Sequence, residues 1–142
     1  MKIIRKNRLS IFFSVLLLFS LASCSKKIQF LTSSVVPAAR GSVKMNHDKN
    51  NNYVIQIQLF DLAEVQRLQP SRQSYVIWMV SDRGSPKNIG QIKSSKGNMS
   101  KSLKASFETV SSFKPNKIFI TAEDDPNVRF PDTLIVLTTD EF

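Results

Sequence analysis

The feature that most restricts the fold is an apolar segment near the middle of the chain, residues 74–81, with the sequence SYVIWMVS. Successive side chains of an extended strand point to opposite faces. Both faces of this segment are apolar: one carries Tyr75, Ile77 and Met79, and the other carries Val76, Trp78 and Val80. Turn-forming residues bound the segment at 69–71 and 82–86. The pattern predicts a central strand that is buried on both sides.

Six further segments alternate between apolar and polar residues or are strongly apolar, and turn residues separate them. They are residues 43–47, 53–60, 88–93, 103–108, 117–122 and 133–138. About seven strands in about 100 residues predict an all-β, immunoglobulin-like antiparallel β-sandwich, with a small barrel as the alternative. Trp78 is then expected to fill the space between the sheets. Residues 62–68 are helix-like but too short for a helix that stands alone, and Gly90 predicts a bulge or a close backbone approach.

Length, charge and cysteine content limit the class of protein further. The 142 residues suffice for one domain with a core. The net charge is +9, but four basic residues lie in the first 23, and without them 16 basic residues face 11 acidic ones. This excess aids solubility, and without a basic helix or a stacked-aromatic motif it does not indicate nucleic acid. Cys24 is the single cysteine, so a disulfide within the chain is excluded and the apolar core must stabilise the domain.

The N-terminus has the layout of a secretory signal. Residues 1–8 are basic, and residues 11–19 form an apolar run. At about a dozen residues with its flanks, this run is too short to cross a hydrocarbon core of about 30 Å comfortably. The proportions are those of a signal peptide.

The sequence Leu21-Ala22-Ser23-Cys24 that follows resembles the lipobox of bacterial lipoproteins. The resemblance implies that the Cys24 thiol receives a diacylglyceryl group, that cleavage precedes Cys24, and that the new amine is acylated. Two or three acyl chains, at about 0.8 kcal/mol per buried CH₂, anchor a protein durably. The alternatives are an ordinary signal peptide that is cleaved elsewhere and an uncleaved anchor. We expect a chain anchored by lipid in the cell membrane or outer membrane, facing the periplasm or the exterior.

The expected organisation therefore has three parts. Residues 1–23 are the lipoprotein signal peptide, residues 24–41 a lipidated tether, and residues 42–142 the β-sandwich domain. The tether is weakly patterned, although residues 28–31 have the composition of a short strand. As a loose coil, about 15 residues span on the order of 20 Å.

The body also resembles a known family. Leu62, Pro70, residues 75–78 (YVIW) and residues 89–92 (IGQI) resemble a run in the extracytoplasmic domain of anti-sigma-K factors. Residues 118–123 (IFITAE) and 131–134 (PDTL) are similar to its later part. The resemblance implies the sandwich fold and a place outside the inner membrane. Those factors also carry a cytoplasmic sigma-binding domain and a transmembrane helix. We expect neither in this chain, so the resemblance does not imply their signalling role.

Acidic residues form one group of candidate site residues. Glu123, Asp124 and Asp125, with Asp132 nearby, are weak candidates for Ca²⁺ ligands, because this ion takes six to eight oxygens. The simpler interpretation is an acidic loop that caps a turn before Pro126. His47 is the single histidine and is expected at the surface, so no catalytic set is predicted and the chain is expected not to be an enzyme.

Basic residues form the second group. Lys93, Lys96, Lys101 and Lys104 surround a serine-rich loop and are candidates for a patch that binds anionic lipid or acidic glycan. The alternative is an ordinary solvated loop that discourages pairing at a sheet edge.

The leading hypothesis is a membrane-anchored, non-catalytic binding module of the cell envelope, with an envelope protein partner, a possible link to anti-sigma-type regulation and no cofactor. Binding of acidic glycan or anionic lipid through the basic loop is the second hypothesis, and an enzyme the third.

Overall fold

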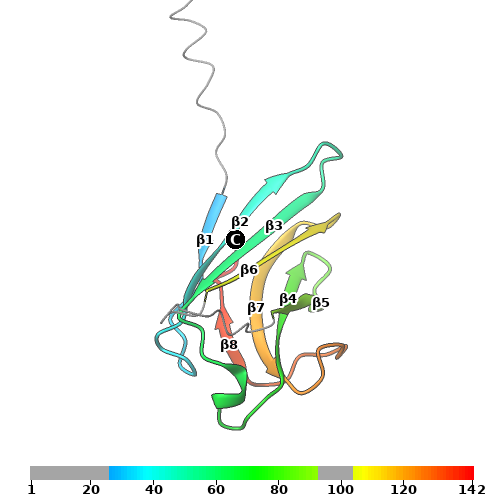
Figure 1. The fold of residues 1–142 in the computed structure, drawn as a ribbon. Coiled ribbons are helices and arrows are strands. Elements are labelled where there is room, and N and C mark those ends of the chain that lie inside the picture. Colours follow the sequence, from blue (N-terminus) through cyan, green and yellow to red (C-terminus); the bar gives the residue numbers. More distant parts are fainter. Residues whose placement is uncertain (1–25, 93–103) are drawn as a thin grey trace, which may run out of the picture.

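The structure, a computed structural model, describes residues 26–92 and 104–142, and these residues form eight strands in two antiparallel sheets (Figure 1). The predicted β-sandwich is therefore confirmed. The strands are β1 (Lys26–Gln29), β2 (Arg40–His47), β3 (Tyr53–Phe60), β4 (Ser74–Ser81), β5 (Lys87–Ile92), β6 (Lys104–Ser111), β7 (Pro115–Glu123) and β8 (Ile135–Thr138). The helix-like piece is a single 3₁₀ turn, η2 (Val65–Arg67).

The first sheet has the order β1-β2-β3-β6 and the second β5-β4-β7-β8. The two sheets meet on one side, where Phe30 bridges to Thr139 and the Leu31 N–H donates to the Thr138 carbonyl at 2.8 Å. On the other side Gly90 of β5 faces β6, and a Cβ at Gly90 would lie 2.5 Å from the Phe107 ring. The β4–β5 register shifts beside Gly90, whose φ is +147°. Gly90, for which the sequence predicts a bulge or a close approach, thus lies beside a register shift and directly against the Phe107 ring.

Strand β4 is buried on both faces, as its sequence predicts. Tyr75, Ile77 and Met79 face the first sheet and belong to the main core. The expected position of Trp78 between the sheets is wrong, because alternation places it on the opposite, outer face of the second sheet. There it forms a small cluster with Val76 and Phe119, and Val128 packs against this cluster. Val128 belongs to residues 124–134, which we call the cover loop.

The segment expected to be a tether is, in its described part, a piece of the sandwich. Strand β1 pairs with β2 from Lys26↔Met45 to Gln29↔Ser42. Val36 and Ala39 are buried in the main core. The weak sequence pattern arises because β1 is a short edge strand with three exposed residues of four. The sandwich therefore begins at residue 26 at the latest, well before residue 42.

Candidate functional site

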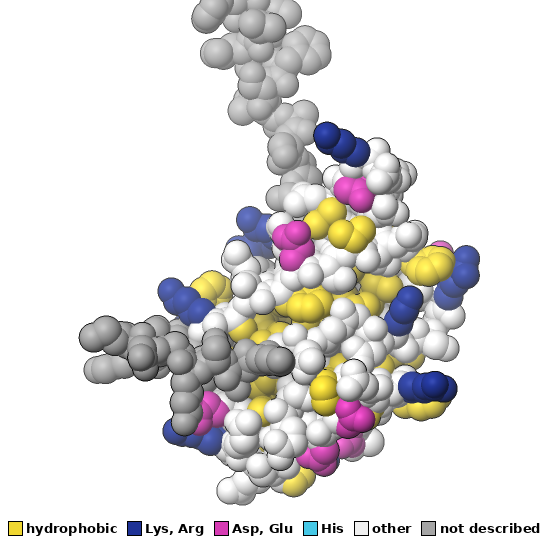
Figure 2. Space-filling model, turned by 45° about the vertical axis from the view of Figure 1, so that its right-hand side comes forward, with side chains coloured by type: hydrophobic (Ala, Val, Ile, Leu, Met, Phe, Trp, Pro, Cys, Tyr) yellow, Lys and Arg dark blue, Asp and Glu magenta, His cyan; other side chains and the backbone are white. Residues whose placement is uncertain are grey.

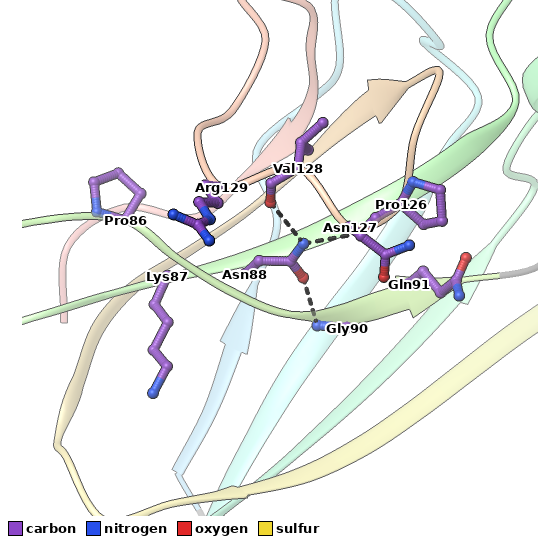
Figure 3. A pocket seen from close by; sticks show the side chains of 9 residues that line it. All are labelled: Pro86, Lys87, Asn88, Gly90, Gln91, Pro126, Asn127, Val128 and Arg129. Carbon is purple, nitrogen blue, oxygen red and sulfur yellow. Dashed lines mark hydrogen bonds between the residues drawn. The ribbon is translucent and has the colours of Figure 1, made fainter.

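A polar groove lies between strand β5 and the cover loop, with a volume of about 560 Å³. Asn88 of β5 holds the two walls together: its Nδ2 donates to the carbonyls of Pro126 at 2.9 Å and Val128 at 3.1 Å. Its Oδ1 accepts the Gly90 N–H at 3.1 Å (Figure 3). All of these bonds are made to backbone groups, so they fix the path of the cover loop over β5.

The charge of this groove is positive. Its lining consists of Pro86, Lys87, Asn88, Gly90, Gln91, Pro126, Asn127, Val128 and Arg129. Lys87 and Arg129 are the charged members of that set, and both are exposed. They lie towards the Pro86 end of the groove, whereas Gln91 and Asn127 lie towards the other end (Figure 3). Two cations and several amide groups can bind carboxylates and hydroxyls together.

The predicted acidic residues lie at the root of the cover loop, where they serve the structure. Glu123 is only 4% exposed. Its Oε1 accepts the Thr121 hydroxyl at 2.5 Å and the Asp132 N–H at 2.9 Å. The Thr121 hydroxyl in turn accepts the indole N–H of Trp78 at 2.8 Å. Two consecutive hydrogen bonds therefore link the buried indole of Trp78, through the Thr121 hydroxyl, to the buried side chain of Glu123.

Arg72, which precedes β4, binds the two ends of the cover loop from the other side. Its guanidinium binds Asp124 and Asp132, each at 2.7 Å. Hydrogen bonds from the Thr133 backbone and hydroxyl, together with the charge of Arg72, lower the pKa of Asp132 below its usual value. The pairing with Asp124 raises the pKa of Arg72. Asp125 accepts the Asn127 N–H at 2.9 Å and so shapes the loop.

This arrangement gives the proposed Ca²⁺ ligands other partners. Within residues 26–92 and 104–142, no group of three or more His, Cys, Asp or Glu side chains is placed to hold a metal ion. The acidic cluster is instead a cap on the cover loop, as the simpler interpretation of the sequence has it.

The remaining candidates divide between surface and undescribed positions. His47 is exposed at the end of β2, with its ring centroid 4.6 Å from that of Tyr53. Lys104 begins β6, with its Nζ 6.0 Å from the Phe60 ring. Cys24, Lys93, Lys96 and Lys101 lie outside the described residues. In the part of the chain that is described, no helix has the length and hydrophobicity to cross a membrane.

The groove escaped prediction because its lining comes from two segments about 40 residues apart. The sequence features that indicate the groove are weak. They are Asn88, two residues before Gly90 in an edge strand, and single basic residues at positions 87 and 129. Comparison with known proteins adds no assignment, since no family model, no curated protein and no solved structure matches the chain.

Proposed function

We propose that this protein is a lipid-anchored, non-catalytic binding module of the cell envelope, and that the groove between β5 and the cover loop binds an acidic glycan. The observation that carries the proposal is the groove itself, which Asn88 fixes through backbone bonds and which Lys87 and Arg129 make cationic. Carboxylates of the glycan would pair with the two cations, and its hydroxyls would bind the amides. The resemblance of Leu21–Cys24 to a lipobox supports the anchor.

The binding site can be tested with the full-length, membrane-reconstituted protein and a fluorescent uronic-acid oligosaccharide. We expect the double variant Lys87→Glu/Arg129→Glu to lose binding. The matched control Lys27→Glu/Lys49→Glu changes the charge equally at exposed residues outside the groove and should still bind. Equal loss in both variants, or equal binding of a neutral oligosaccharide, would contradict the proposal.

The anchor has its own test. Metabolic labelling with an alkyne fatty acid should mark the wild-type protein and leave Cys24→Ala unmarked. A labelled Cys24→Ala protein, or an unlabelled wild type, would reject lipidation at this residue.

A regulatory role through another protein is the second candidate, and the residues that resemble the extracytoplasmic anti-sigma-K domain favour it. Such a role requires a partner that spans the membrane. Cross-linking in the envelope, followed by recovery of a specific membrane-spanning protein, would support it. Recovery of no such partner by wild-type protein would reject it.

A further inference from the structure

We propose that the sandwich has no stalk and that one end of its two sheets lies against the headgroups of the bilayer. This end, which we call the near end, comprises the start of β1, the turns at residues 48–52, 82–86 and 112–114, and the C-terminal residues 140–142. The inference rests on the lipidation of Cys24 proposed above and adds the surface through which the domain meets the membrane.

Covalent geometry provides the first step. Strand β1 is paired from Lys26 onward. Consecutive Cα atoms lie 3.8 Å apart, so the Cα atoms of Cys24 and Lys26 are separated by at most about 7.6 Å whatever the conformation of Ser25. A thioether-linked lipid holds its cysteine at the bilayer surface. The first residue of β1 is therefore held on the order of 10 Å from the headgroups.

Strand pairing identifies what lies beside that residue. Lys26 pairs with Met45 near the end of β2, and the turn that follows leads to Tyr53. Tyr53 pairs in turn with Ser111 at the end of β6. Figure 1 shows the start of β1 and the β2–β3 turn at the same end of the molecule.

The second sheet reaches the same end. Ser81 pairs with Pro115, and the N–H of Phe142 donates to the Asn116 carbonyl at 2.9 Å. The Lys26 ammonium lies 5.4 Å from the Phe142 ring centroid, which joins the first residue of β1 to the C-terminus. The near end is thus a platform made by both sheets.

Charge does not drive this contact. Basic and acidic side chains both occur at this end of the molecule (Figure 2). The start of β1 and the three turns carry Lys26, Lys49, Arg83 and Lys114, and these are balanced by Asp48 and Asp82 of the turns together with Asp140 and Glu141 of the C-terminus. A platform with balanced charge gains little from anionic lipid. The covalent link therefore determines which surface meets the bilayer, and the contact should resist added salt.

The opposite end points away from the membrane. An eight-residue strand such as β4 spans about 26 Å at 3.3 Å per residue, and β4 begins, at Ser74, beside Glu123 at the root of the cover loop. The η2 turn and the base of the cover loop accordingly face the envelope space.

Depth-dependent quenching tests the orientation on the lipidated protein in vesicles. Asn50→Cys reports on the near end, Gln66→Cys on η2 at the far end, and Gln58→Cys on the outer face of the first sheet; each residue is exposed. The lipidated Cys24 does not react with a thiol dye, so each variant carries one label. With nitroxide on the lipid headgroups, we expect quenching at residue 50 several-fold above that at 66 and 58, equal in low and high salt.

A Gly/Ser insert of about ten residues between Ser25 and Lys26 supplies a control. It adds a coil of about 17 Å root-mean-square length, so quenching at residue 50 should fall while the protein stays on the vesicles. Equal quenching at residues 50 and 66, strongest quenching at 58, or no effect of the insert would overturn the inference. Failure of vesicle flotation and of fatty-acid labelling would instead overturn the anchor itself, so the two failures are distinguishable.

Discussion

Tyr75, Ile77 and Met79 are covered by a second β-sheet, whereas Val76 and Trp78, on the opposite face of the same strand, are covered by a loop. The inner face joins a large core drawn from nearly every strand. The outer cluster has three buried members. One strand therefore presents two cores of very different size, although Ile77 and Trp78 are equally inaccessible to solvent.

The two cores are stabilised by different interactions. Sheets that pack face to face bury apolar area over their whole surface, and that area stabilises the inner core. A loop has no such surface and must be fixed by bonds to its backbone and its charged residues. Here Asn88, Glu123 and Arg72 provide them. The outer core therefore depends on a few polar and charged groups, and the inner core depends mainly on contact area.

The largest difference should appear when the inner core loses volume. Ile77→Ala deletes buried methyl and methylene groups opposite Ile120. Such a deletion leaves a cavity and typically costs about 2–5 kcal/mol. We expect that loss in the free energy of unfolding, measured with denaturant. Phe130→Ala in the cover loop, at a residue 82% exposed, should change it by less than about 0.5 kcal/mol. Similar losses in both variants would show that burial in the inner core does not set the cost of the deletion.

Alkaline pH should weaken the inner core through its one ionisable member. The Tyr75 hydroxyl donates to the Ala63 carbonyl at 2.9 Å, and burial raises the pKa of Tyr75 to about 12. The folded state therefore favours the protonated phenol. Its contribution is complete below the unfolded pKa near 10 and is lost as the pH rises through 12. The shift of about two units corresponds to roughly 3 kcal/mol.

The measurement uses a Tyr53→Phe background, in which phenolate absorbance reports on Tyr75 alone. Phenolate absorbance and loss of the fold should rise together near pH 12. Adding Tyr75→Phe should remove this part of the pH dependence, at a cost of about 1 kcal/mol at neutral pH for the lost hydrogen bond. Ionisation of Tyr75 near pH 10 with the fold intact would show that the inner core is not closed around it.

The same comparison explains how much of the molecule the sequence could predict. Strand positions followed from local alternation, and the two apolar faces of residues 74–81 required cover on both sides. Alternation does not say which face meets the other sheet, so Trp78 was placed in the wrong core. The choice depends on the cover loop, whose position is set by contacts such as Asn88 to Val128, 40 residues apart.

Edges and sites were harder to predict for related reasons. Strand β1 has one strand neighbour and no fully buried residue, so its sequence resembles that of a tether. The acidic residues at 123–125 were visible as a cluster, but their partner Arg72 is about 50 residues away and could not be assigned from spacing. Interactions between distant segments thus determine both the groove beside β5 and the role of its acidic neighbours.

Acid should loosen the outer core before the inner core, an effect smaller than the other two. The pKa of Asp132 is lowered in the folded state by Thr133 and Arg72. Its contribution is therefore complete above its ordinary value near 4 and is lost as the pH falls through the lower folded value. Loss of this cap should free the cover loop locally. Trp78 emission should then shift to the red while far-UV circular dichroism keeps its native value.

Two variants make this acid response specific. Asp132→Asn keeps the shape of the side chain but cannot titrate, so the red shift of Trp78 should lose much of its pH dependence. Asp48 lies at the other end of the sandwich, and its pKa is likewise lowered, by hydrogen bonds from Asn52; Asp48→Asn should leave the Trp78 response unchanged. If emission and circular dichroism instead change in one transition in all three proteins, the two faces of β4 unfold as a single unit and the outer core has no independent stability.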